Sequence, residues 1–223
     1  MEKQTQKIFE TAEKILSQIP EHVILVAAAK TRTLEEVKTV IQAGVKHIGY
    51  NYVQEALPII HEIGSAAQWH MIGHLQTNKA KHVAESFDLM ETIDSWRLAK
   101  YLDRRCKMLG RIMPVLIEIN SGRESNKTGV LPGNVDSLVE KVSQLENLKL
   151  QGLMTMGPRF GEPENSRPYF QLTRSIFDRI ADMNLPNVEM KYLSMGMSNT
   201  YPIAIEEGAN IVRIGTRLFG ERS

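Results

Sequence analysis

Eight short runs of aliphatic and β-branched residues recur along the chain, and the segments between them have helical spacing. The runs start roughly 20 to 40 residues apart, which is too far for hairpins and enough for a strand, a helix and two turns. This spacing predicts parallel βα units and an α/β fold. Eight such units favour a closed (β/α)8 TIM barrel, and an open doubly wound sheet is the structural alternative. We predict strands at Val23–Ala29, His47–Tyr50, Gln68–Gly73, Leu89–Ile93, Pro114–Asn120, Leu150–Met156, Val188–Met195 and Asn210–Thr216.

The two ends of the chain depart from a simple barrel. An extra amphipathic helix over residues 8–19 precedes the first run, and only Arg217–Ser223 follow the last one. That tail is too short for a full final helix, so we expect the N-terminal helix to cover the gap on the barrel exterior. The sequence shows no linker or low-complexity tract, and residues 1–223 are predicted to form a single domain.

Composition excludes several classes of partner. The chain has 27 Lys+Arg and 26 Asp+Glu residues, a formal net charge of +1, so it offers no general attraction to nucleic acid. Its longest apolar run, Val23–Ala29, is far too short to cross a bilayer. Cys106 is the only cysteine, which fits a reducing compartment. We therefore expect a cytoplasmic protein that binds neither nucleic acid nor membrane.

The end of the first run offers a nucleophile. Active sites of such barrels lie at the C-terminal ends of the strands, and the first run ends at Lys30, directly after small alanines that leave room for a ligand. A primary amine in that place can attack an aldehyde. The alternative is an ordinary solvated lysine at a strand end.

The last two runs supply polar groups suited to a phosphate, which barrel enzymes commonly bind in the loops after strands seven and eight. Ser198 is predicted to cap a helix through Asn199–Glu207, and Gly215 and Thr216 follow the eighth run. Closure of the barrel should pair the eighth strand with the first and bring Arg213 beside Lys30 on the rim. An amine, a guanidinium and a phosphate cradle suit a small phosphorylated aldehyde such as pyridoxal 5′-phosphate (PLP).

Six blocks of sequence resemble the pyridoxal phosphate homeostasis proteins, and together they span essentially the whole chain. The blocks are Leu25–Lys30, Gly49–Glu55, Trp69–Lys79, Gly152–Met156, Leu193–Ser198 and Val212–Thr216. The sequence departs from the usual family pattern at Tyr50, where Glu is usual, and at Thr200, where Asp is usual.

The resemblance implies a barrel like the N-terminal domain of alanine racemase and a set of cofactor-binding residues, with no metal. In this set Lys30 forms a Schiff base with PLP, and Arg213 hydrogen-bonds the pyridine nitrogen. The phosphate is held by Ser198, Gly215 and Thr216. Ser194 lies near the phosphate, and Asn51 lies near the ring.

The pairing of arginine with the pyridine nitrogen argues against rapid turnover. Arginine stays protonated, so the ring nitrogen stays unprotonated and the ring is a poor electron sink. Alanine racemase has a second catalytic base from a further domain, which this chain does not show. We therefore expect a monomer that holds PLP for buffering or for delivery to PLP-dependent apoenzymes, with little or no turnover.

Three alternatives stay open. A racemase-like PLP enzyme could take its second base from Tyr50 or Tyr201. A Schiff-base aldolase would use Lys30 to attack a sugar phosphate. A pure interaction module would bind no aldehyde at all.

Two histidines fit a metal pattern only superficially. His70 and His74 have the i, i+4 spacing of a helical zinc pair, but Gly73 between them and the preceding strand disfavour a helix. We expect both to shape the rim of the barrel.

Overall fold

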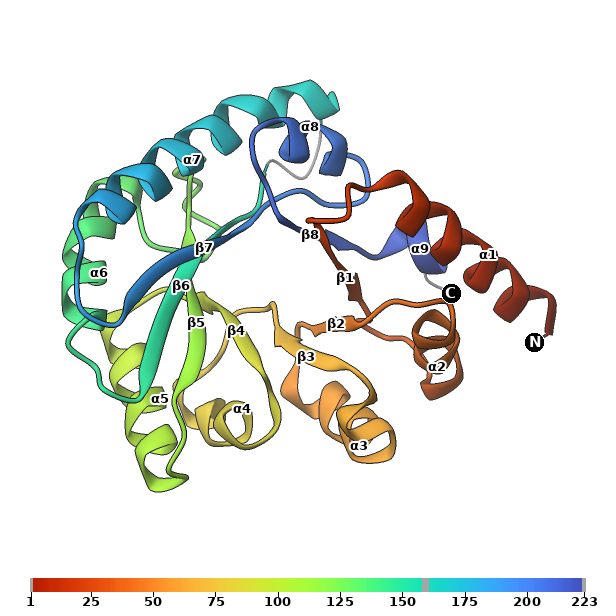
Figure 1. Ribbon diagram of the computed structural model, residues 1–223, viewed down its shortest axis with the longest axis horizontal. Coiled ribbons are helices and arrows are strands. Elements are labelled where there is room, and N and C mark those ends of the chain that lie inside the picture. The colour runs from red at the N-terminus through yellow and green to blue at the C-terminus, as the bar shows by residue number, and fades with distance from the viewer. Residues whose placement is uncertain (1, 158–160, 222–223) are drawn as a thin grey trace.

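The computed structural model describes residues 2–157 and 161–221 and shows a closed parallel barrel with its strands in sequence order (Figure 1). The closed (β/α)8 prediction is confirmed, and the open sheet is wrong. Each predicted run contains most of one strand. The strands are β1 (Ile24–Ala28), β2 (His47–Tyr50), β3 (Gln68–Met71), β4 (Leu89–Ile93), β5 (Met113–Ile119), β6 (Leu148–Thr155), β7 (Val188–Ser194) and β8 (Ile211–Ile214).

Helices surround the barrel and cover its outer face (Figure 1). They are α1 (Glu2–Gln18), α2 (Leu34–Gln42), α3 (Val53–Ile63), α4 (Ala80–Ser86), α5 (Trp96–Met108), α6 (Val135–Val142), α7 (Arg167–Asp182), α8 (Tyr201–Glu206) and α9 (Thr216–Phe219). Within residues 2–157 and 161–221, none of these helices combines the length and the apolar character needed to span a bilayer.

Alternation along the strands creates two apolar layers. The larger lies between the sheet and the helices, and it includes Ile48, Tyr50 and Trp69. The smaller fills the barrel itself and includes Val26, Ile72, Leu89, Leu116, Met154 and Ile211. Where the alternation is regular, residues on a strand that lie an even number of positions from a member of this second set therefore face the barrel interior.

The N-terminal helix covers the outside of the barrel where the last helix is short, as predicted. α9 has 4 residues, and α1 packs against both α2 and α9 (Figure 1). α2 begins with a capping box, in which the Thr33 hydroxyl accepts from the Glu36 amide and the Glu36 carboxylate accepts from the Thr33 amide. The first and last described helices, α1 and α9, thus lie on the same side of the barrel (Figure 1).

The predicted cap of the helix after β7 is wrong. α8 begins at Tyr201 with Thr200 at the N-cap position, and no side chain caps it. The Thr200 hydroxyl accepts from the Met197 amide and closes the preceding turn, while Pro202 occupies the first turn of the helix, where proline is favoured. Ser198 is therefore free for a different contact, described below.

The connection from β6 to α7 is described only in part. Residues 158–160 lie outside the described part of the chain. Pro163–Ser166 form a 3-10 turn that leads into α7.

Candidate functional site

Lys30 lies just beyond β1, half-buried at the C-terminal end of the barrel. Its Nζ atom is 3.5 Å from the Tyr52 hydroxyl and 4.8 Å from the centre of the Tyr52 ring. The next residue, Thr31, has a left-handed backbone with φ of 64°, and its N–H donates to the Glu55 carboxylate at 3.0 Å. Tyr52 and Glu55 both come from the β2–α3 region, so that region fixes the turn that presents the amine.

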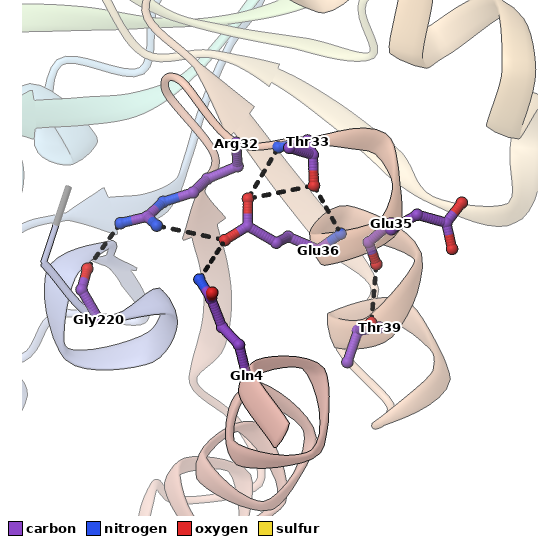
Figure 2. A network of polar contacts seen from close by, with 7 residues as sticks. All are labelled: Gln4, Arg32, Thr33, Glu35, Glu36, Thr39 and Gly220. Atoms are coloured by element: carbon purple, nitrogen blue, oxygen red, sulfur yellow. Dashed lines mark hydrogen bonds and ion pairs between the residues drawn. The ribbon is translucent and has the colours of Figure 1, made fainter. Parts of the chain in front are cut away.

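Arg32 ties this turn to the C-terminal helix, as Figure 2 shows. One guanidinium nitrogen donates to the Gly220 carbonyl at 2.6 Å, and the other donates to the Glu36 carboxylate at 3.3 Å. The guanidinium carbon lies 5.2 Å from the centre of the Phe219 ring. Gln4 of α1 donates to the same Glu36 oxygen at 3.3 Å. The Lys30 turn, α1, α2 and the end of α9 are thus joined by one group of polar contacts.

The loops after β7 and β8 meet beside that turn. Gly196 in the first loop has φ of 88°, and a Cβ there would lie 2.6 Å from the Ala204 Cβ, so only glycine fits. The Ser198 hydroxyl accepts from the Arg217 amide at 3.2 Å. This contact places Ser198 at the start of α9, beside the residue that follows Gly215 and Thr216 in the chain, and the role of the three as a phosphate cradle stays a prediction.

Arg213 faces the barrel interior at a greater depth than predicted. It pairs with Val26 on β1, four residues before Lys30, and only 4% of its surface is exposed. Lys30, by contrast, lies beyond the last residue of β1 and is half-buried. The predicted position of Arg213 on the rim is therefore wrong, because the register places it inside the barrel.

Arg213 is held by Ser194 and Thr155. Its guanidinium donates to the Ser194 hydroxyl and, at 2.9 Å, to the Thr155 carbonyl. The Ser194 hydroxyl in turn donates to the Glu91 carboxylate at 2.6 Å, and that carboxylate lies 3.7 Å from the guanidinium. Ser194 is fully buried, and its one hydroxyl proton is used on Glu91.

The Glu91 carboxylate continues this chain toward β3 and β2. Its other oxygen lies 2.6 Å from Nδ1 of His70, and Nε2 of His70 lies 2.9 Å from Nδ1 of His47. Burial alone would raise the pKa of Glu91, but the hydrogen bond and charge of His70, with Arg213 and Ser194, lower it below its ordinary value. Burial and the neighbouring His70 lower the pKa of His47 to about 4. His70 is therefore an interior residue, and only His74 lies at the rim, 3.0 Å from Asp94.

Sequence reasoning missed Glu91 and Tyr52. The signal for Glu91 was present, because a carboxylate in the middle of the apolar run Leu89–Ile93 requires a buried partner. Tyr52 gave no comparable signal, since its contact with Lys30 depends on how the ends of β1 and β2 are arranged.

A cavity of about 460 Å³ lies next to the Lys30 turn at the ends of β2 and β3. Asn51, Tyr52, Gly73 and His74 contribute to its lining. A Cβ on Gly73 would lie 2.4 Å from the Asn51 carbonyl oxygen, so the absence of a side chain lets the two strand ends approach. A larger groove, of about 1030 Å³, lies outside the barrel between α1 and α2, and Lys30 lines neither this groove nor the smaller cavity.

Two tyrosines considered as second bases lie away from the barrel interior. Tyr50 and Tyr201 both belong to the layer between the sheet and the helices. Burial raises the pKa of Tyr50, and its hydroxyl has no partner among the residues that the structure describes. Neither phenol shares the interior face with Arg213.

The model of the alanine racemase N-terminal domain family matches residues 5–223. A pyridoxal phosphate homeostasis protein of Aquifex aeolicus is 42% identical over 199 residues, which cover 89% of this chain and 86% of that protein. The chain belongs to the pyridoxal phosphate homeostasis protein family. A member from Escherichia coli is 37% identical, over 91% of this chain and 87% of its own.

Solved structures agree with this family membership. PipY of Synechococcus elongatus, in a structure with PLP bound, has a TM-score of 0.88 and 32% identity, with coverage of 96% of this chain and all of that one. Alanine racemase of Clostridium difficile has a TM-score of 0.77 at 17% identity, and 56% of its length is covered. The racemase comparison shows a shared barrel fold and nothing about activity.

Proposed function

We propose that this protein binds PLP and serves PLP homeostasis, holding the cofactor for buffering or delivery with little or no turnover. The observation that carries the proposal is the half-buried amine of Lys30, at the same end of the barrel as Ser198, Gly215 and Thr216. PipY, a relative of the same fold at 32% identity, has been solved with PLP bound. Bound PLP supplies an aldehyde that condenses reversibly with primary amines.

The residues present fit the chemistry of that cofactor. Lys30 supplies the amine for the aldehyde, and the hydroxyls of Ser198 and Thr216, with the backbone at Gly215, suit a phosphate. Arg213 keeps N–H groups beyond those used on Ser194 and Thr155, and a pyridine nitrogen can accept one of them. Asn51 lines the cavity at the ends of β2 and β3.

Low turnover is supported by the charge on Arg213 and by the positions of Tyr50 and Tyr201, the two tyrosines considered as second bases. A permanently charged guanidinium beside the ring nitrogen keeps a proton off that nitrogen. The racemase-like alternative needs a second base, and Tyr50 and Tyr201 both lie in the helix-facing layer. The aldolase alternative uses the same lysine, so the trapping experiment described below must distinguish it from PLP binding.

Other features belong to the same proposal. We infer that residues 1–223 act as one domain, that the protein is a cytoplasmic monomer, and that PLP-dependent apoenzymes are its partners. The single cysteine, Cys106, is buried, as expected for a thiol with no disulfide role.

Reductive trapping tests the assignment of Lys30. The purified protein is incubated with PLP, reduced with borohydride and digested, and mass spectrometry should locate a phosphopyridoxyl group on Lys30. Lys30→Ala should abolish the adduct, while Lys38→Ala, a substitution of an exposed lysine on α2, should leave it unchanged. An adduct at another residue, or trapping of a sugar phosphate in place of PLP, would refute the proposal.

A further inference from the structure

A continuous chain of polar contacts crosses the barrel interior from Arg213 to His47. It passes through Ser194, Glu91 and His70, and each link is a contact of 3.0 Å or less. Glu91 and Ser194 are completely buried. Burying a charge is costly unless it is paired and hydrogen-bonded, so this arrangement needs an explanation beyond packing.

Arg213 has two acidic side chains near it, and they behave differently. Glu118 on β5 is buried, its Oε1 accepts from the Thr128 hydroxyl at 2.9 Å, and its Oε2 has no partner among the described residues. Burial raises the pKa of Glu118 and favours its neutral form. Glu91 accepts hydrogen bonds at both oxygens, from Ser194 and His70, which favours its ionised form. Glu91 is therefore the carboxylate that compensates the charge of Arg213.

We propose that Glu91 is a positioning residue for Arg213, and that it fixes the guanidinium where a bound pyridine ring meets it. The inference rests on the proposed function. Ser194 transmits the constraint, because its hydroxyl accepts from Arg213 and donates to Glu91. His70 holds the other carboxylate oxygen, so Glu91 cannot turn toward another partner.

This assignment gives Ser194 a different task from phosphate binding. Its proton is directed at Glu91 and its oxygen at Arg213, and the side chain is fully buried. Ser194 thus supports the ring-binding arginine from within the barrel. The phosphate is left to the loops after β7 and β8.

The test uses Glu91→Gln and PLP labelled with nitrogen-15 at the ring nitrogen. The substitution keeps the shape of the side chain and removes its charge, so Arg213 loses its counter-ion and shifts from its place. In the wild-type protein the labelled nitrogen should stay unprotonated at every pH at which the protein is folded. In Glu91→Gln it should become protonated as the pH falls, and PLP should be held roughly 10- to 100-fold less tightly, the loss expected for one hydrogen bond to a charged group.

Thr92→Val is the matched control. Thr92 is the neighbour of Glu91 on β4, it is buried, and its hydroxyl donates to the Gly73 carbonyl at 2.8 Å. Its removal should lower stability and leave the nitrogen-15 spectrum of bound PLP as in the wild type. A general loss of packing would change both variants alike.

Ser194→Ala provides a second variant that keeps both charges and breaks the bridge between them. It should fold and show partial protonation of the ring nitrogen. The inference is overturned if the nitrogen-15 spectra of both Glu91→Gln and Ser194→Ala match that of the wild-type protein. If Glu91→Gln does not fold, a spectrum of Ser194→Ala that matches the wild type is enough to overturn it. Failure of the wild-type protein to take up labelled PLP would instead refute the proposed function.

Discussion

The contacts of Arg32 predict a measurable cost for disconnecting the Lys30 turn from the C-terminal helix. Arg32→Met keeps the apolar stem of the side chain and removes its charged end. The lost contacts are the hydrogen bond to the Gly220 carbonyl, the ion pair with Glu36 and the stacking on Phe219. The Arg32 side chain is only 8% exposed, so water replaces little of what is removed.

The magnitude follows from these contacts. A hydrogen bond from a charged donor contributes about 1.5–3 kcal/mol, and a cation–aromatic contact adds about 0.5–1 kcal/mol. The ion pair with Glu36 adds about 0.2–0.5 kcal/mol, as expected at i, i+4 spacing. We therefore expect the free energy of unfolding to fall by about 2–4 kcal/mol, which lowers Tm by about 5–15 °C in a chain of this size.

Thermal unfolding followed by circular dichroism measures this loss, and binding titrations measure its effect on the site. Because Arg32 joins the turn that follows Lys30 to the helix that begins at Thr216, the variant should lose more affinity for PLP than for pyridoxal, which lacks the phosphate. Gln4→Ala removes an exposed contact with the same Glu36 and should change Tm by a small fraction of that amount. A Tm equal to that of the wild type, or equal losses for PLP and pyridoxal, would refute the reasoning.

Two further predictions concern the β2–β3 side of the barrel. Gly73→Ala should lower the free energy of unfolding in urea by at least about 1–3 kcal/mol, because the added Cβ would lie 2.4 Å from the Asn51 carbonyl oxygen. An unchanged urea midpoint would contradict the close approach of the two strand ends. The lowered pKa of His47 predicts that stability rises with pH from about 4 to 6.5, because the unfolded state binds the proton more tightly than the folded state across this window. His47→Gln should flatten this part of the stability profile, and an unchanged slope would show that His47 does not carry it.

Most of the strands were predictable because they are buried apolar runs in a parallel sheet, and such runs stand out from helical spacing. β7 is the exception, because residues 188–192 alternate between half-buried and exposed. The position of Lys30 at the end of the first strand was predictable for the same reason, since the first run stops at a charged residue. The meeting of Ser198 with the start of α9 followed from the order of the barrel strands, although the capping role given to Ser198 was wrong.

The depth of Arg213 could not be read from the sequence. It depends on the register between β1 and β8, which places Arg213 opposite Val26, and register is set by side-chain packing across the whole barrel. The bond between Glu91 and Ser194 joins residues 103 positions apart. A carboxylate in an apolar strand signals that a partner exists, but the sequence does not say which of the other strands supplies it.

Closure of the sheet by its first and last strands has a consequence for synthesis. Lys30 leaves the ribosome well before Arg213, Gly215 and Thr216. A chain interrupted before β8 would retain the amine but lack the groups proposed for the ring and the phosphate, and its β1 and β7 edges would be open to pairing with other chains. Such fragments should aggregate without capturing the vitamin-derived aldehyde, so uptake of the cofactor reports that synthesis has passed β8 and that the barrel has closed.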